Sequence, residues 1–185
     1  MTHLGTKAIA TNRLILRRFE PADAVDMFQT WASDDQVSCY MSWPPHPAIE
    51  TSQQVIADWV ECYQNVAFYN WAIVIKATGQ LIGSIGLIGV DNQNQRAEAG
   101  YCIGRAFWRQ GYTSEALAGV LTFLFCEVGF NRIEARHDVR NPNSGGVMLK
   151  CGMVYEGTLR QYGIDRQGNP YDSKIYASLR SEFNG

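Results

Sequence analysis

Two arginines and a glycine stand between an apolar strand and a helix, an arrangement that could bind a phosphate group. Arg105, Arg109 and Gly111 follow a predicted strand that ends near Ile103 and precede a predicted helix that begins near Thr113. The first turn of a helix leaves N–H groups without partners and carries the positive end of the helix dipole, so it attracts anions. A glycine there lets the backbone approach a pyrophosphate closely. An ordinary strand-to-helix turn explains the spacing equally well, and the spacing alone favours that simpler interpretation.

A second stretch with functional residue types runs from Arg132 to Met153. It is typical of a strand, an asparagine-rich turn and a short helix that ends at a glycine. Ser144 can cap that helix together with a neighbouring asparagine, because short oxygen-bearing side chains accept hydrogen bonds from the first N–H groups. Asn141 also favours a turn before Pro142.

Together these segments resemble the GNAT superfamily, and more closely its branch with the RimJ and RimL ribosomal-protein N-terminal acetyltransferases. Residues 108–116 (Trp-Arg-Gln-Gly-Tyr-Thr-Ser-Glu-Ala) are similar to the coenzyme A pyrophosphate loop of that branch. Residues 141–144 (Asn-Pro-Asn-Ser) and 150–153 (Lys-Cys-Gly-Met) are similar to its Asn-x-x-Ser helix and the end of that helix. Residues 11–17 (Thr-Asn-Arg-Leu-Ile-Leu-Arg) match its opening strand, so the resemblance spans nearly the whole chain.

Three residues depart from the superfamily pattern. Trp108 and Thr113 fill the first and last positions of the loop, and Met153 stands where phenylalanine is common. Trp108 is usual for the RimL-like branch, and Met153 is expected to change only the packing. Thr113 is expected to cap the helix through its hydroxyl group.

The resemblance implies two neighbouring strands that splay apart and admit the pantetheine arm of acetyl-CoA. Backbone groups of residues 101–103 would pair with that arm, and one N–H would hold the thioester oxygen. Arg105 and Arg109 would neutralise phosphate charge unless they are simply solvated, and Asn141 would steady the arm. The implied coenzyme-binding residues are Tyr101, Ile103, Arg105, Arg109, Gln110, Gly111, Tyr112, Thr113, Ser114, Asn141 and Ser144.

Two residues are candidates for assisting the chemistry. Ser144 resembles the branch's serine near the leaving sulfur, where other members carry a tyrosine acid, and its alternative role is the helix cap. Glu98 is the candidate base, acting through water, because the family often has a glutamate on this strand; its alternative role is that of an exposed strand-start carboxylate. His137 and Asp138 are adjacent on a predicted strand and point to opposite faces, so we interpret them as structural.

Other patterns have simpler explanations. Residues 83–89 resemble a phosphate loop but lie inside a predicted strand with no helix behind it, which excludes a dinucleotide fingerprint. Acceptor specificity is expected in the loop 43–47 and in the segment 162–171. The aromatic residues that could line an acceptor pocket, although each is singly more typical of core or rim, are Tyr40, Trp43, Tyr69, Trp71, Tyr162 and Tyr171.

The remaining periodicity predicts a mixed α/β fold with a central sheet. The expected strands are 14–18, 71–75, 81–90, 98–103, 132–139, 154–160 and 171–179. A first helix is expected to begin at Pro21, and three more helices are expected at 49–65, 113–128 and 143–151. Val25, Met27, Phe28 and Trp31 form the apolar stripe of the first helix, and three prolines keep residues 39–47 irregular. The resemblance makes this a GNAT-type twisted mixed sheet with splayed strands, flanked by helices. We expect a loosely held arm (1–10) and one acyltransferase domain (11–185).

Composition excludes several classes of function. The 185 residues are 46% hydrophobic, and 16 basic against 18 acidic side chains give a net charge of −2, so a duplex nucleic-acid binder is not expected. Five widely spaced cysteines without a CxxC pair and three scattered histidines favour reduced thiols and no metal site. The sequence has no membrane-length apolar run and no apolar signal segment. A cytoplasmic protein without membrane contact is therefore expected.

The prediction is an acetyl-CoA-dependent N-acetyltransferase, with acetyl-CoA as co-substrate and no metal. The acceptor is a primary amine, either a protein N-terminal α-amine or a small-molecule amine, and the protein is a monomer or a homodimer. A non-catalytic acyl-CoA sensor remains the alternative, and an interaction protein that only keeps the fold is a third. Turnover of acetyl-CoA separates the first from the second, and the third predicts no acetyl-CoA binding.

Overall fold

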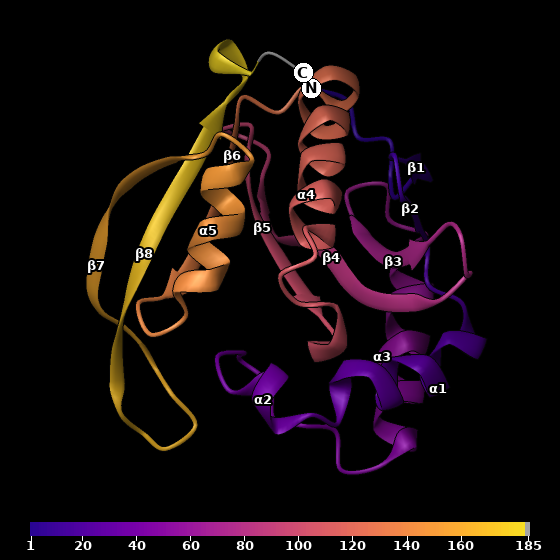
Figure 1. Cartoon of the computed structure of the whole chain (residues 1–185). Helices are drawn as coiled ribbons and strands as arrows, with labels where there is room; N and C mark the ends of the chain where they lie inside the picture. The colour runs from indigo at the N-terminus through magenta and orange to yellow at the C-terminus, as the bar shows by residue number, and fades with distance from the viewer. Residues whose placement is uncertain (184–185) are drawn as a thin grey trace.

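The computed structural model describes residues 1–183, and its centre is a twisted eight-stranded sheet with the order β1-β2-β3-β4-β5-β6-β8-β7 (Figure 1). Neighbouring strands are antiparallel except β5 and β6, which are parallel. The strands are β1 (Ile9–Ala10), β2 (Leu14–Arg17), β3 (Asn70–Ile75), β4 (Leu81–Asp91), β5 (Arg96–Ile103), β6 (Arg132–Asp138), β7 (Val154–Ile164) and β8 (Pro170–Leu179).

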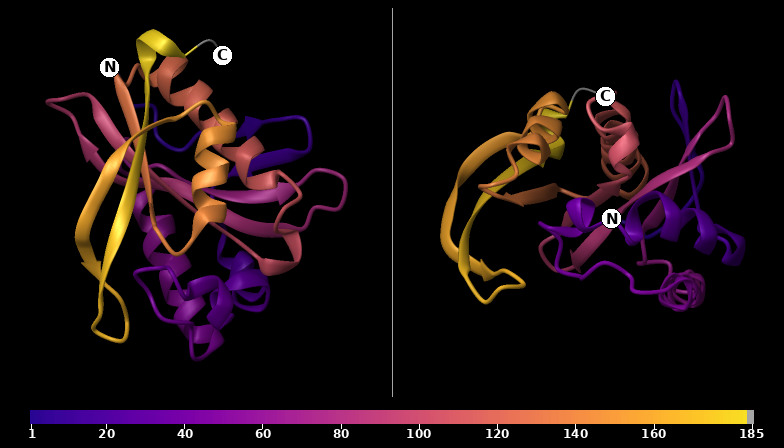
Figure 2. Two further views of the ribbon diagram at one scale, coloured as in Figure 1. Left: turned by 60° about the vertical axis from the view of Figure 1, so that its left-hand side comes forward. Right: turned by 60° about the horizontal axis from the view of Figure 1, so that its bottom comes forward.

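Helices cover both faces of the sheet. One face carries α4 and α5, and α1 and α3 pack on the other, as the right-hand view of Figure 2 shows. The helices are α1 (Ala24–Met27), α2 (Asp35–Ser38), α3 (Ile49–Cys62), α4 (Tyr112–Thr122) and α5 (Pro142–Lys150). Short 3₁₀ turns lie at Pro21–Asp23, Arg105–Phe107 and Arg180–Glu182, and π-helical turns at Phe28–Ala32 and Phe123–Val128. This is the mixed α/β architecture predicted from the sequence.

The parallel pair β5 and β6 separates after a short contact. Their register joins Arg96 with Arg132, Ala97 with Ile133 and Glu98 with Glu134. Beyond Glu98, β5 continues to Ile103 alongside β4, while β6 continues to Asp138 alongside β8. The strands therefore splay, as expected, and the ends of β5 and β6 are far enough apart to admit a ligand between them.

The larger core lies between the sheet and α4. Ala116, Leu117, Val120 and Leu121 are fully buried and recur at helical spacing on one face of α4. Burial of each large side chain contributes roughly 1.5–3 kcal/mol, so this face fixes the position of the helix. The start of α4 is thereby held rigidly at the end of β5.

The first ten residues do not form the loosely held arm that we expected. The Thr2 N–H donates to the Val128 carbonyl at 2.9 Å, and the Gly5 N–H donates to the Val66 carbonyl at 2.8 Å. The Trp71 indole donates to the Lys7 carbonyl at 2.7 Å. Hydrogen bonds to partners more than sixty positions away hold this segment, and a local sequence pattern does not reveal them.

Most predicted elements are confirmed within a few residues, with two differences in helical geometry. Val25 is 44% exposed and does not join the core stripe that Met27 and Trp31 form. This segment passes from 3₁₀ through α to π geometry, so its buried positions do not follow a 3.6-residue period. The long helix likewise becomes π-helical at Phe123. It ends at Val128, as predicted, and Gly129 caps it with φ +88°.

The strand and span predictions also compare closely with the structure. The strand β7 extends to Ile164, four residues beyond its predicted end. Residues 39–47 are irregular, as the prolines indicate. Of the helices within residues 1–183, none reaches the length and apolarity that a membrane span requires.

Candidate active site

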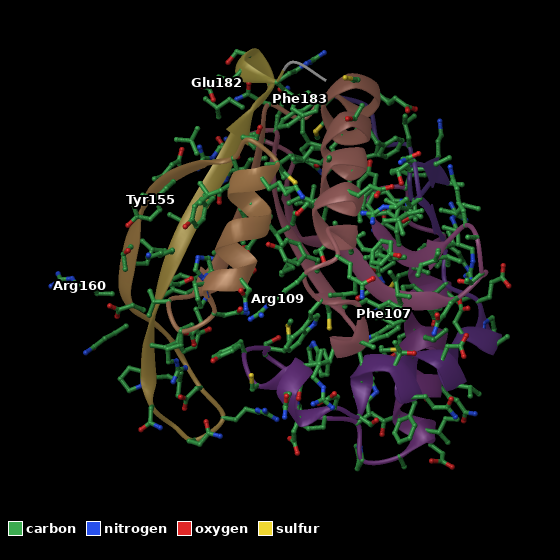
Figure 3. The ribbon with its side chains drawn as sticks, viewed as in Figure 1. Phe107, Arg109, Tyr155, Arg160, Glu182 and Phe183 are labelled. Carbon is green, nitrogen blue, oxygen red and sulfur yellow. The ribbon has the colours of Figure 1, made fainter. Side chains whose placement is uncertain are left out.

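A cleft of about 360 Å³ opens where β5 and β6 separate. Tyr101, Cys102 and Ile103 of β5 form its floor, and the loop before α4, one side of α5, and α2 form its walls. Figure 3 shows Phe107 and Arg109, both lining residues, near the adjacent ends of α4 and α5. Burial raises the pKa of the Cys102 thiol to about 12, so this thiol stays neutral and is a poor nucleophile.

One end of the cleft is built for an anion. Gly111 precedes α4 in the left-handed conformation at φ +81°, which glycine adopts without strain. Thr113 and Ser114 line the cleft from the first turn, where N–H groups lack intrahelical acceptors. The Glu115 N–H bonds to the Gly111 carbonyl, which makes Gly111 the N-cap. The expectation that Thr113 caps the helix is therefore wrong, because the cap lies two residues earlier.

Three cationic side chains surround this helix start. Arg109 and Lys150 line the cleft, from the loop and from the last turn of α5 respectively. A Cβ placed on Gly111 would lie 3.5 Å from Nη2 of Arg13 and 3.6 Å from Nζ of Lys150. The helix dipole and these charges together attract a group with two negative charges, such as a pyrophosphate. The sequence interpretation included Arg109 but assigned no charge role to Arg13 or Lys150.

Glu115 holds Arg13 in this position. Its carboxylate accepts hydrogen bonds from the Thr11 hydroxyl at 2.6 Å and from Nε of Arg13 at 2.7 Å. Burial raises the pKa of Glu115, but the hydrogen bonds from Thr11 and Arg13 outweigh burial and leave this pKa below its ordinary value. The opening strand is thereby tied to the anion-binding end of α4.

Three residues of the predicted coenzyme set lie apart from the cleft-lining residues of the described chain. Nε of Arg105 pairs with Asp34 at 3.1 Å, and its Nη1 donates to Gln36. The Gln110 amide donates to the Ala106 carbonyl at 2.8 Å. The Arg13 guanidinium lies over the Tyr112 ring, and its Cζ is 4.3 Å from the centroid of that ring. Arg105 thus has an acidic partner at the N-cap of α2, which local sequence reasoning missed.

The other end of the cleft carries a pair of hydroxyl groups. The Tyr101 hydroxyl donates to the Ser144 carbonyl at 2.8 Å and lies 3.0 Å from Oγ of Ser144. Burial raises the pKa of Tyr101, and the hydrogen bond with Ser144 offsets only part of that effect. Asn141 is the N-cap of α5 and lines the cleft beside Ser144. The hydroxyl of Ser144 contacts Tyr101 rather than the helix end, so the capping role is not observed among the described residues.

The side chain of Glu98 lies on the face of the sheet opposite to the one on which Tyr101 and Ser144 meet. Nε of Arg136 donates to Oε1 of Glu98 at 2.6 Å, and Nη2 donates to Oε2. Arg136 also donates to the Tyr162 hydroxyl and stacks over that ring. The structure therefore does not bring Glu98 together with Ser144. Glu98 and Arg136 occupy the same face of adjacent parallel strands, so their opposite charges indicate an ion pair only once the order of the strands is known.

His137 and Asp138 face opposite ways, as predicted. His137 lies beneath α5, where a Cβ at Gly145 would meet its Nε2 at 2.5 Å. Asp138 forms an ion pair with Arg140 instead, and Arg140 also binds Asp165 in the β7–β8 turn. The histidine and the aspartate thus belong to different sets of contacts.

The remaining wall comes from α2 and the residues behind it. Gln36, Val37, Tyr40 and Met41 line the cleft there, so one of the predicted acceptor-pocket aromatics does reach it. Among the other aromatic candidates, Tyr69 and Trp71 are core residues with at most 1% exposure. Trp43 contacts His46, Tyr162 stacks on Arg136 and Tyr171 lies under Arg140. Val37 and Met41 gave no sequence signal, because short apolar segments are equally common in cores.

Comparison with known proteins agrees with this geometry. Residues 13–154 match the model of the acetyltransferase (GNAT) domain. YoaA of Bacillus subtilis (strain 168), described as an uncharacterized N-acetyltransferase, is 34% identical over 172 residues, which cover 93% of this chain and 96% of that protein. The ribosomal-protein-serine acetyltransferase of Escherichia coli (strain K12) is 32% identical over 112 residues, 60% of this chain and 62% of that protein.

A solved structure extends the comparison to the fold. The crystal structure of an acetyltransferase of the GNAT family from Bacillus anthracis superimposes with a TM-score of 0.84 at 26% sequence identity. The match covers 95% of this chain and 100% of that one.

Proposed function

Because the chain belongs to the GNAT family of acetyltransferases, we propose that it transfers the acetyl group of acetyl-CoA to the α-amine of a protein N-terminus. The family membership makes it an acyl-CoA-dependent N-acetyltransferase. The cleft between the splayed strands, with its cationic helix start, is the observation that carries the coenzyme side of the proposal. The protein acceptor is proposed on the similarity to an acetyltransferase that is named for a ribosomal protein.

The proposed coenzyme site uses the anion-binding end of the cleft. The pyrophosphate contacts the first-turn N–H groups at Gly111 to Ser114, with Arg109 and Lys150 supplying charge. The pantetheine arm runs along residues 101–103, where β5 no longer pairs with β6 and has backbone groups to offer. Asn141 borders the arm from the opposite wall. One β5 N–H holds the thioester oxygen as negative charge develops on it.

The chemistry needs little acid or base help when the acceptor is an α-amine. An amine with a pKa of ~8 costs about 1.4 kcal/mol to deprotonate at pH 7, against roughly 4.6 kcal/mol for a lysine at ~10.4. Positioning and the oxyanion contact can then supply much of the rate. Ser144 assists departure of the sulfur. Glu98 stays a predicted base. Its ion pair with Arg136 stabilises the carboxylate and reduces the contribution it can make to deprotonating the amine.

The test combines binding and turnover. Acetyl-CoA at about a hundred times its dissociation constant should stabilise the fold by ~2.7 kcal/mol, and adenosine should stabilise it far less. Incubation with acetyl-CoA and a panel of N-terminal peptides should release free thiol and add one acetyl group to a peptide. Peptides with a blocked N-terminus and an internal lysine, together with small amines, are the controls.

Each outcome has a distinct meaning. Acetylation of small amines alone would overturn the protein acceptor and keep the enzyme. Binding of acetyl-CoA without turnover on any amine would favour the sensor alternative. A fold that does not respond to acetyl-CoA at all would contradict the coenzyme site.

A further inference from the structure

The hydroxyl pair at the reactive end of the cleft has a geometry that a helix cap does not require. Tyr101 projects from β5 and Ser144 from the first turn of α5, so the pair joins the two walls of the cleft. The phenolic oxygen lies 2.8 Å from the Ser144 carbonyl oxygen and 3.0 Å from Oγ. Its single proton can therefore go to either oxygen by rotation about the phenolic C–O bond, with no movement of heavy atoms.

We propose that Tyr101 is a positioning residue that directs the Ser144 hydroxyl proton at the sulfur of coenzyme A. The inference rests on the proposed function, which brings the sulfur to this end of the cleft. When the Tyr101 hydroxyl donates to the Ser144 carbonyl, the phenolic oxygen accepts a hydrogen bond from the Ser144 hydroxyl, and the Ser144 proton then does not point into the cleft. When Tyr101 donates to Oγ, the Ser144 proton is released to point into the cleft.

The exchange fits the balance of the reaction. Collapse of the tetrahedral intermediate forms the amide and breaks the carbon–sulfur bond, and the electron pair leaves with sulfur. The amine contributes one proton more than the amide keeps, and that proton ends on the sulfur. Ser144 donates a hydrogen bond to the departing thiolate, while Tyr101 donates to Oγ and compensates the charge that Ser144 gains.

The surroundings of Tyr101 keep it a donor. Burial raises the pKa of its phenol, so the group is neutral through the physiological range. The titratable groups that influence this pKa are Cys151 at the end of α5 and Tyr176 of β8. His137 of β6 packs against Gly145 and stacks on Tyr176, and Arg109 and Lys150 line the same cleft. Burial raises the pKa of the Cys151 thiol to about 11, and burial also raises the pKa of Tyr176, so both are neutral as well. Because Tyr101, Cys151 and Tyr176 are neutral, the Tyr101 phenol keeps its proton and can donate it toward Ser144 when charge develops on the sulfur.

The experiment uses free coenzyme A as the probe, so it needs no acceptor. The ultraviolet absorbance of the bound thiolate is titrated with pH in the wild type, Tyr101→Phe, Ser144→Ala and the double variant. A complex with desulfo-coenzyme A provides the blank. Tyr176→Phe is the matched control, because it removes a buried hydroxyl from a ring beside the site without touching Ser144.

We expect Tyr101→Phe to lower the bound thiolate fraction near neutral pH about fivefold, which is the effect of roughly one ordinary hydrogen bond, because Tyr101 contacts the neutral Ser144 hydroxyl and not the sulfur itself. Calorimetry should show the affinity for coenzyme A changed less than threefold. Because Tyr101 acts through Ser144, the double variant should match Ser144→Ala within twofold. The control should match the wild type. With acetyl-CoA and an active peptide, kcat should fall while KM stays constant.

Each of the following results would overturn the inference. A thiolate fraction in Tyr101→Phe equal to that of the wild type would show that the phenol has no influence on the sulfur. A further loss in the double variant would show that Tyr101 acts independently of Ser144. Absence of coenzyme A binding by the wild type would overturn the proposed function and this inference with it. If Tyr101→Phe does not fold, 3-fluorotyrosine at position 101, a stronger donor, should raise the thiolate fraction, and no rise would refute the idea.

Discussion

Gly111 offers the sharpest test of the anion site, because two substitutions of nearly equal shape differ there in charge. Aspartate and asparagine would both adopt the left-handed backbone at φ +81°, at a similar cost of about 1 kcal/mol. Their Cβ atoms would lie 3.5 Å from Arg13 and 3.6 Å from Lys150, which is ordinary contact distance. Only the aspartate carboxylate would compete with a pyrophosphate for these two cations.

The magnitude follows from Coulomb's law. Two unit charges ~5 Å apart, here the aspartate carboxylate and one charge of the pyrophosphate, repel each other by about 1.7–3.3 kcal/mol at an effective dielectric constant of ~20–40. Gly111→Asp should therefore bind acetyl-CoA roughly 15- to 300-fold more weakly than Gly111→Asn. Calorimetric titration measures the ratio, and thermal unfolding of the free proteins should show Gly111→Asp to be at least as stable as Gly111→Asn, because its carboxylate lies beside Arg13 and Lys150. Pantetheine, which lacks the pyrophosphate, should not distinguish the two variants. Equal affinities of the two variants for acetyl-CoA would refute the location of the phosphate site.

Further expectations concern the elements that hold the site. Gly145→Ala should lose about 1–3 kcal/mol in urea unfolding, because its Cβ would meet His137 at 2.5 Å, whereas Gly146→Ala, with open space around it, should be neutral or stabilising. Glu115→Gln should cost about 1 kcal/mol at pH 7. Since the folded pKa of Glu115 is lowered, its contribution exists above the unfolded pKa near ~4.3 and disappears as pH falls through the folded value, so the variant and the wild type should converge in acid. Glu98→Gln should change kcat less than tenfold; loss of an acidic limb from the kcat/KM profile would instead make Glu98 the general base.

The sequence predicts the fold well because its elements have strong local signals. The continuous apolar run of β3, the apolar face of α4 and the glycine that ends the long helix are each contained within one element. The two segments that resemble the GNAT superfamily indicate the strand-to-helix turn at Gly111 and the helix with Ser144, and the structure places both on the same cleft.

The remainder depends on partners that are distant in sequence. Arg13 and Lys150 approach Gly111 from opposite ends of the chain, and Arg105 turns away because Asp34 lies beside it. Glu98 has the residue type and the strand position expected of a base, yet Arg136 from the next strand occupies both of its oxygens. Such pairings follow from sheet order, which no local pattern determines.

The short contact between β5 and β6 has a consequence for folding. Three residue pairs join the part of the sheet built from β1 to β5 to the part built from β6 to β8. The two parts are therefore expected to open as separate cooperative units in the free protein. A ligand that pairs with the exposed ends of both strands would couple them into one unit. Amide hydrogen exchange should then slow together at residues 101–103 and 136–138 on binding, including positions that the ligand does not touch.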